Sequence, residues 1–276
     1  MSSDLPSKIG IIAGGGRMPI LLAEECARRN IEVFGVGFED HTDSDFFELC
    51  PNITSKLGQV GTIIKAFQKR DVQDLVLIGS IKRPSFSELI PDLKATKFLA
   101  KNGLKAQGDS GLLSALREFL EGEGFRIHGI QDFIPDLVIS EGVLTKTKPN
   151  KQDRADIERG IEVLQGMAAI DIGQAVIVQD GLVLGVEAIE GTSALIERCA
   201  PLKRKGAKGV LLKLCKPQQD VMLDLPTIGI ETLKRIHEAG FGGIAAHAGK
   251  SLIVDQEELV SYANQHHLYM VGVNPN

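Results

Sequence analysis

The chain has 276 residues, of which 43% are hydrophobic and 24% are charged, and this ordinary globular composition excludes disorder by composition. The net charge is −5 and no long stretch is basic, which argues against a nucleic-acid binder, because such proteins need a basic field to displace counterions from phosphates. No apolar run approaches the roughly 20 residues that span a bilayer, and the stretch at 9–13 is too short for a signal-peptide core.

The first half of the chain alternates short apolar runs with segments of helical spacing. Strands are predicted at Ile9–Ala13, Glu32–Phe38, Asp74–Gly79 and Phe125–Ile130, and helices at Met18–Arg29, Val60–Arg70 and Gly111–Glu123. Continuous apolar strands that alternate with helices are typical of a parallel sheet covered on both faces. We therefore predict an α/β protein in which residues 1–138 form a Rossmann-like domain that binds nucleotide or substrate.

The pattern changes after about residue 138. Helices are predicted at 154–167, 230–239 and 255–265, and strands at 175–178, 182–186, 209–214 and 268–273. The Asp180-Gly181 pair between the first two of these strands is a hairpin signal, which contrasts with the parallel pattern of the first half. Residues 139–276 are predicted to form a mixed α/β domain that carries the catalytic groups.

A glycine loop follows the first predicted strand. Gly14, Gly15 and Gly16 precede the first helix, and Gly14 and Gly16 fit the first two positions of a dinucleotide-binding fingerprint. The third position is Pro19, which suits a first helical turn but lacks the close packing that the third glycine allows. The loop is interpreted as a backbone site for a nucleotide or phosphate, and a purely structural tight turn stays open as the alternative.

Three polar clusters mark the second half: Asp171–Gln174 and Glu187–Thr192 on either side of the hairpin, and Lys213–Gly229 after a later strand. The third cluster holds Lys213, Lys216, Asp220 and Asp224. Such lysines can neutralise phosphate and such carboxylates can hold Mg²⁺, which is commonly bound by one or two carboxylates together with substrate phosphates. A loop of this kind is more often merely solvated, so that interpretation also stays open. The chain has no Gly-x-Ser-x-Gly motif, and covalent catalysis therefore has no support.

These motifs, in this order, resemble the LpxI-type UDP-2,3-diacylglucosamine pyrophosphatase family of lipid A biosynthesis. The resemblance covers nearly the whole chain, from about residue 8 to about residue 272. In the first half it rests on Gly14–Gly16 with Pro19, on Gly79–Pro84 and on Gly108–Leu113. In the second half it rests on Asp171–Gln174, on Glu190–Thr192 and on the stretch 216–229.

The resemblance implies a metal-dependent hydrolase that splits the pyrophosphate of UDP-2,3-diacylglucosamine into UMP and 2,3-diacylglucosamine 1-phosphate, called lipid X. The implied cofactor is Mg²⁺ or another divalent cation such as Mn²⁺. Carried onto this sequence, the expected catalytic residues are Asp224, Asp220, Glu190 and Lys216, and the expected metal ligands are Asp224, Asp171 and Glu190. The expected substrate-binding residues are Gly14, Gly15, Gly16, Lys82, Arg83, Gly108, Asp109, Ser110, Gln174, Thr192, Lys213 and Thr227.

Two other functions stay open: a nicotinamide-dependent oxidoreductase that uses the glycine loop, and a non-catalytic carrier of a sugar nucleotide or lipid. The expected partner is a small lipid-nucleotide substrate rather than nucleic acid, and the sequence leaves open a peripheral contact with the inner membrane and a homodimer. Cys26, Cys50, Cys199 and Cys215 show neither C-x-x-C nor zinc-like spacing, so we interpret them as reduced thiols of a cytoplasmic protein.

Overall fold

The computed structural model describes residues 5–81, 91–102 and 108–275, with the backbone alone at 101–102 and 108–110. The chain divides into two compact units. Met1–Pro135 forms the first unit together with the short segment Asp220–Asp224, and the remaining residues, Asp136–Gln219 and Leu225–Asn276, form the second. The inclusion of Asp220–Asp224 in the first unit differs from the sequence analysis, which assigned it with its neighbours to the second domain.

The first unit is built on a parallel sheet. Within the described residues its strands are β1 (Lys8–Ala13), β2 (Glu32–Phe38), β3 (Asn52–Ser55), β4 (Asp74–Ile78) and β5 (Arg126–His128). They run parallel in the order β3-β2-β1-β4-β5. This is the order of a Rossmann-like sheet that starts at a central strand and grows outward to both sides, as the alternation of strands and helices predicts.

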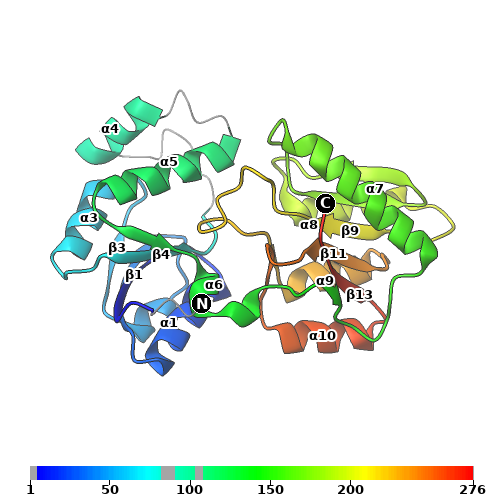
Figure 1. The fold of residues 1–276 in the computed structure, drawn as a ribbon, viewed down its shortest axis with the longest axis horizontal. Coiled ribbons are helices and arrows are strands. Elements are labelled where there is room, and N and C mark those ends of the chain that lie inside the picture. The colour runs from blue at the N-terminus through cyan, green and yellow to red at the C-terminus, as the bar shows by residue number, and fades with distance from the viewer. Residues whose placement is uncertain (1–4, 82–90, 103–107, 276) are drawn as a thin grey trace. The chain divides into compact units, whose positions relative to one another are not determined.

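Helices cover both faces of this sheet (Figure 1). The described helices are α1 (Arg17–Arg28), α2 (Phe46–Leu49), α3 (Val60–Gln68), α4 (Leu93–Asn102), α5 (Gly108–Gly122) and α6 (Ile130–Phe133). Apolar residues of α3 and α5 form one hydrophobic core with strands β2, β4 and β5, and α1 buries its own apolar stripe on the opposite face. Strand β2 is apolar at nearly every position because both of its faces are buried.

The second unit contains a mixed sheet. Its described strands are β6 (Gly142–Val143), β7 (Ala175–Gln179), β8 (Leu182–Val186), β9 (Val210–Lys213), β11 (Gly243–His247) and β13 (Tyr269–Val273), and β10 (Thr227–Ile228) pairs separately with β12 (Leu252–Ile253). The larger sheet has the order β6-β13-β11-β9-β7-β8. Strands β9, β11 and β13 are parallel, whereas β7 and β8 form the predicted antiparallel hairpin.

Two hydrophobic cores sandwich the second sheet. Helix α7 (Lys151–Ala168) packs on one face, and α8 (Gly191–Cys199), α9 (Ile230–Glu238) and α10 (Gln256–Gln265) pack on the other. Strand β7 shows the period of two that this requires: Val176 and Val178 join the α7 core, and Ala175 and Ile177 join the opposite core. The short 3₁₀ turns Pro135–Leu137 and Ala200–Leu202 complete the described elements.

The sequence analysis missed helices α4 and α8 and several strands, of which some are short and others lack strand formers. Strand β3 reads Asn-Ile-Thr-Ser at the edge of its sheet, and β11 reads Gly-Ile-Ala-Ala-His although it lies in the middle of its sheet. Small residues have low strand propensity, and only the packing of neighbouring strands on both sides makes β11 a strand. Helix α9 begins after Gly229 without a side-chain cap, and the Thr227 hydroxyl donates to the carbonyl of Leu225.

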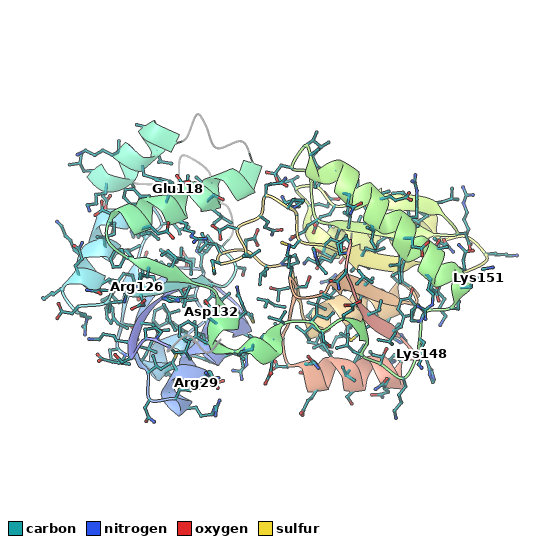
Figure 2. All side chains as sticks on the ribbon, in the orientation of Figure 1. Arg29, Glu118, Arg126, Asp132, Lys148 and Lys151 are labelled. Carbon is teal, nitrogen blue, oxygen red and sulfur yellow. The ribbon has the colours of Figure 1, made fainter. Side chains whose placement is uncertain are left out.

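Charged side chains occupy the surface of each unit. Arg29 and Glu118 in the first unit and Lys148 and Lys151 in the second are exposed and project outward (Figure 2). None of the described helices combines the length and the apolar character that a membrane crossing needs. All four cysteines are free thiols, and three of them are buried.

Candidate active site

The first unit contains a cavity of about 570 Å³ beside the carboxyl ends of β1 and β4. Its walls are almost wholly aliphatic and come from the sheet, from α3 and from α5. The lining residues are Ile12, Gly14, Phe38, Leu57, Gly58, Val60, Ile63, Ile64, Leu77, Ile78, Gly79, Ser80, Ile81, Leu112, Leu113, Leu116, Leu120, Leu223 and Asp224. Asp224 is the one charged residue among the lining residues that the structure describes, which makes this aliphatic pocket a site where apolar and ionic groups of a ligand can be bound together.

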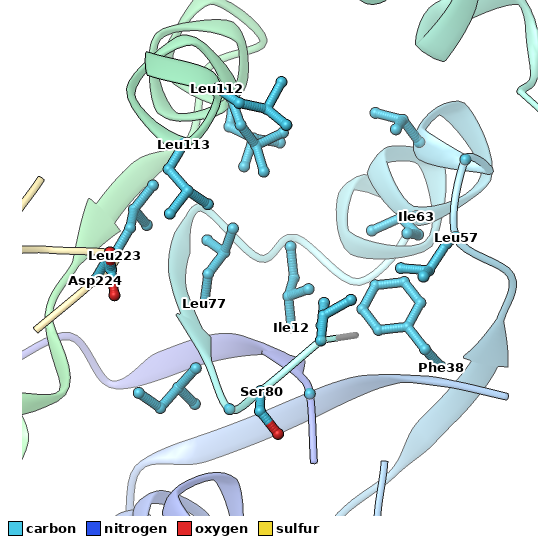
Figure 3. A pocket seen from close by; sticks show the side chains of 18 of the residues that line it. Ile12, Phe38, Leu57, Ile63, Leu77, Ser80, Leu112, Leu113, Leu223 and Asp224 are labelled. Atoms are coloured by element: carbon cyan, nitrogen blue, oxygen red, sulfur yellow. The ribbon is translucent and has the colours of Figure 1, made fainter. Parts of the chain in front are cut away.

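Asp224 lies at one end of the aliphatic pocket, beside Leu223, and Phe38 and Leu57 lie at the other end (Figure 3). Leu112 and Leu113 line the side formed by α5, and Ser80 lies at the loop that follows β4. A ligand with a charged group at the Asp224 end would therefore place an apolar group toward Phe38.

The segment Asp220–Asp224 is held on the first unit at several points. The Asp220 carboxylate pairs with the Arg117 guanidinium of α5 at 3.2 Å and accepts the Met222 amide at 3.0 Å. The Asp220 carbonyl accepts the amide of Asp224 at 2.8 Å. Met222 and Leu223 pack against the hydrophobic core of α3 and α5. Asp220, expected to be catalytic, thus acts in this structure as the anchor that positions Asp224.

The glycine loop is held by hydrogen bonds within the chain. The Gly14 amide donates to the carbonyl of Ile78 and the Gly15 amide to that of Ser80, both at 2.8 Å. The Gly16 amide donates to the Asp43 carboxylate at 2.5 Å. The expected role of these amides as phosphate donors is therefore not met in this conformation. Glycine is needed at position 14 for close approach, because a Cβ there would lie 2.6 Å from the Ser80 carbonyl oxygen.

In the second unit, the first two polar clusters meet at a buried carboxylate. Glu187 is 6% exposed and accepts the Gln174 amide at 3.1 Å and the Thr192 hydroxyl at 2.6 Å. The Gln174 side-chain oxygen accepts a bond from Gln219 at 3.2 Å, which brings in the third cluster. Three segments that are separated in the sequence thus converge at one end of the second sheet.

Lys216 and Lys213 are both engaged within this group of residues. The Lys216 ammonium lies 2.5 Å from the Asp171 carboxylate, and both side chains are largely buried. The Lys213 ammonium donates to the carbonyl of Thr227 at 3.1 Å. Asp171, expected as a metal ligand, therefore serves here as the counter-ion of Lys216.

Glu190 has a different environment. Its carboxylate pairs with Arg198 at 2.8 Å and accepts the Ala188 amide at 3.1 Å, at the start of α8. Hydrogen bonds to backbone amides, its own first, and to Arg198 hold the pKa of Glu190 below its usual value. These bonds tie the carboxylate to its own loop and helix.

The expected divalent cation would need carboxylate ligands. No three His, Cys, Asp or Glu side chains gather into a preformed metal site within the part of the chain that the structure describes. Asp171 is paired with Lys216 and Glu190 with Arg198, and Asp224 is one of the residues that line the aliphatic pocket. A single carboxylate fits a Mg²⁺ ion that takes its remaining ligands from substrate phosphates and water.

Some expected residues lie outside what the structure describes. Lys82 and Arg83 belong to the undescribed stretch 82–90. Gly108, Asp109 and Ser110 form the start of α5, where the backbone alone is described.

The sequence analysis missed three features of the site. Arg117 lies outside every motif, and Glu187 begins the second polar cluster but was not among the expected site residues; only their partners in space show what they do. The aliphatic lining was visible in part, because Leu112, Leu116 and Leu120 recur at helical spacing on α5. Such a stripe is the usual mark of a core-facing helix, and nothing in it distinguishes a core from a pocket wall.

Comparisons with known proteins cover both units. The profile of the LpxI N-terminal domain matches residues 8–137, and that of the LpxI C-terminal domain matches residues 140–271. The UDP-2,3-diacylglucosamine pyrophosphatase LpxI of Caulobacter vibrioides is 35% identical over 275 residues, which span 97% of this chain and 98% of that protein.

Proposed function

Because this chain belongs to the LpxI family, we propose that it is a hydrolase that splits the pyrophosphate bond of UDP-2,3-diacylglucosamine. One structural observation carries this proposal beyond the similarity: the Asp224 carboxylate lies at one end of a pocket that is otherwise aliphatic. The substrate likewise joins a charged diphosphate to apolar acyl chains, and because carboxylate and diphosphate are both negative, a cation between them would make the Asp224 end attractive to the diphosphate. The products that we propose are UMP and 2,3-diacylglucosamine 1-phosphate, which place the enzyme in lipid A biosynthesis.

The aliphatic pocket suits an acyl chain. Each methylene that leaves water for an apolar site contributes about 0.8 kcal/mol, so a chain of several methylenes supplies substantial binding energy. With the acyl chain directed toward Phe38, the sugar phosphate to which it is attached would lie toward Asp224. Binding energy from the chain would then hold the reacting phosphate in place, which is the main task of an enzyme of phosphoryl transfer.

We propose that Asp224 either orients the attacking water, accepting a proton from it, or holds a divalent cation together with the substrate phosphates. When bound, such a cation would polarise a phosphoryl oxygen and neutralise charge. The Asp220–Arg117 pair keeps the turn that presents Asp224 in place. Lys213 and Lys216 remain the proposed counter-charges for the diphosphate, with Asp171 positioning Lys216.

The test is a measurement of UMP release from UDP-2,3-diacylglucosamine, with Mg²⁺ and with EDTA. Asp224→Asn keeps the shape of the side chain and removes its charge, and it should lower the rate by about 10²–10³-fold. Glu118→Gln is the matched control, because Glu118 is an exposed carboxylate of the same unit outside the pocket. Wild-type turnover in Asp224→Asn would refute the role of Asp224, and unchanged turnover in EDTA would refute the metal.

The two alternative functions are not favoured by the comparisons. The glycine amides that a nicotinamide dinucleotide would need are bonded within the chain. A non-catalytic carrier would bind the lipid nucleotide without releasing UMP, so the same assay distinguishes it from a hydrolase.

Cytoplasmic location, peripheral contact with the inner membrane and a homodimer stay proposals. The cytoplasmic location rests on the cysteine pattern, and the membrane contact rests on the substrate, an amphiphile whose acyl chains lie in a membrane. Co-sedimentation with anionic lipid vesicles and light scattering after gel filtration test the membrane contact and the dimer directly.

A further inference from the structure

A second cavity, of about 270 Å³, lies within the second unit. It is found beyond the carboxyl ends of the parallel strands β9 and β11, which end at Lys213 and His247. In open α/β sheets, ligands bind at this edge. The residues that matter for the argument are Gln174, Cys215, Lys216, His247 and Lys250, and the walls include Leu164, Pro217 and Pro275.

The charged residues among the described lining of this cavity are all positive. Two lysines line it, Lys216 and Lys250, and no Asp or Glu is among its described lining residues. Asp171 holds the Lys216 ammonium from one side at 2.5 Å. Lys250 is exposed and forms no ion pair within the described ranges. Because Asp171 balances the charge of Lys216, Lys250 gives the described lining a net positive charge, which favours an anion.

His247 supplies a polar atom that needs a partner. Its Nδ1 is buried and has no hydrogen-bond partner among the residues that the structure describes. Burial first, and then the nearby Lys250, lower the pKa of His247, and a hydrogen bond with the backbone of Cys215 acts in the opposite direction. Buried polar atoms are nearly always satisfied, so an orphan beside a cavity indicates a ligand or water that occupies it.

We propose that this cavity binds the phosphate group of a nucleoside monophosphate, with Lys216 and Lys250 as its cationic contacts and His247 as a hydrogen-bonding contact. Lysine ammonium groups are common ligands of phosphate. The cavity is smaller than the roughly 300–1,000 Å³ of sites that enclose a whole drug-sized ligand. It therefore suits a phosphate with part of its ribose and not the diacyl sugar. The choice of UMP as this ligand rests on the proposed function.

The Gln174 side chain fits the same role. Its oxygen accepts a bond from Gln219, so the NH₂ group is the remaining donor of the amide. Its backbone is fixed through Glu187, which accepts the Gln174 amide at 3.1 Å. Gln174, expected from the sequence to bind substrate, would thus contact the same ligand as two residues that the sequence analysis did not select, His247 and Lys250.

The test is direct binding of UMP, uridine and inorganic phosphate to the full chain by calorimetry. UMP should bind the wild type, and Lys250→Ala should weaken it by about tenfold or more, because a hydrogen bond to a charged group is lost. Lys205→Ala is the matched control, since Lys205 is an exposed lysine of the same unit outside the cavity. If inorganic phosphate competes with UMP and uridine does not, the phosphate group is the part recognised.

A second readout follows the imidazole itself. Nitrogen NMR of the histidine rings, with His247→Gln to assign the signal, should show the His247 resonance moving on addition of UMP while that of His41, in the other unit, stays in place. Equal UMP affinity in wild type and Lys250→Ala, or an unmoved His247 signal at saturation, would overturn the proposal.

The binding tests need no turnover, which separates this inference from the proposed function. Lys205→Ala should bind UMP and release it from the lipid nucleotide as the wild type does, because Lys205 is exposed and lines neither this cavity nor the aliphatic pocket. If the wild type hydrolyses the lipid nucleotide but Lys250→Ala binds UMP as tightly as the wild type, the inference about this cavity is wrong and the proposed function stands. If Lys250→Ala weakens UMP binding but the wild type releases no UMP from the lipid nucleotide, the proposed function is wrong and the inference about this cavity stands.

Discussion

Phe38 closes the end of the aliphatic pocket that lies opposite Asp224 (Figure 3), and we expect it to limit the length of the acyl chain. Its ring is 6% exposed and belongs to the hydrophobic core of the first unit. Phe38→Leu keeps an apolar side chain while it removes part of the ring from the pocket. Phe38→Ala would open more room, but truncating a buried phenylalanine costs about 3–5 kcal/mol of stability, so the milder change is the better test.

The expected size of the effect follows from the burial of methylenes. If the shortened side chain makes room for about two more methylenes, their transfer from water contributes about 1.6 kcal/mol at about 0.8 kcal/mol each. This corresponds to a factor of about 15 in binding. We therefore expect the acyl-chain length with the highest kcat/KM to increase by about two carbons. In Phe38→Leu, kcat/KM for this longer chain relative to that for the wild-type optimum length should rise roughly tenfold. Much of the change should be in KM, because the chain contacts the enzyme equally in the ground state and the transition state.

The assay is UMP release from a series of UDP-2,3-diacylglucosamines that differ only in chain length. Phe133→Leu is the matched control: Phe133 is a fully buried phenylalanine of the same unit that does not line the pocket. It should lose comparable stability and keep the wild-type chain-length profile. The reasoning fails if Phe38→Leu is folded and active with an unchanged profile, or if both variants shift the profile alike.

Three further predictions concern the first unit. Arg117→Ala should remove the partner of Asp220 and loosen the turn that carries Asp224, so kcat/KM should fall by about 10–100-fold with little change in Tm. Arg117→Lys should recover part of the rate. An unchanged rate in Arg117→Ala would show that the turn holds without the pair. Burial alone would raise the pKa of Asp74, but hydrogen bonds from Arg126 and His128 outweigh it and lower that pKa below its usual value. The folded pKa is thus below the unfolded one, so this stabilisation is present above the unfolded pKa of about 3.9 and is lost as pH falls through the folded value. Urea unfolding should accordingly show a larger deficit for Asp74→Asn at pH 7 than at pH 3, and equal deficits would contradict the assignment. Burial raises the pKa of the Cys26 thiol to about 12, so at pH 8 a thiol reagent should label Cys26 only after unfolding, as mass spectrometry of the labelled peptide can check.

Much of the fold could be predicted from local pattern. The continuous apolar runs at β1, β2 and β4 indicated a sheet buried on both faces, and Asp180-Gly181 indicated the hairpin of β7 and β8. Both signals are local, because burial requires apolar side chains and a two-residue turn requires residues that tolerate positive φ. Strand β11 escaped prediction because its glycine and alanines do not favour a strand on their own.

The sequence also marked the chemistry of the candidate site. The glycine loop, the three polar clusters and their order indicated the family, and the comparisons confirm that family. Residue types alone did not separate ligands from partners. Asp171, Asp220 and Asp224 are the same side chain in similar loops, yet the first holds Lys216, the second holds Arg117, and the third lines the aliphatic pocket.

Only the tertiary structure decided these roles, because each depends on a partner that is distant in the chain. Arg117 and Asp220 are 103 residues apart, and their pairing brings Asp220–Asp224 onto the first unit. The Gly14 and Gly15 amides are occupied because the loop after β4 lies against them. A carboxylate or an amide has the same bonding capacity wherever it occurs in a sequence, and whether a ligand can use it depends on whether folding has already given it a partner.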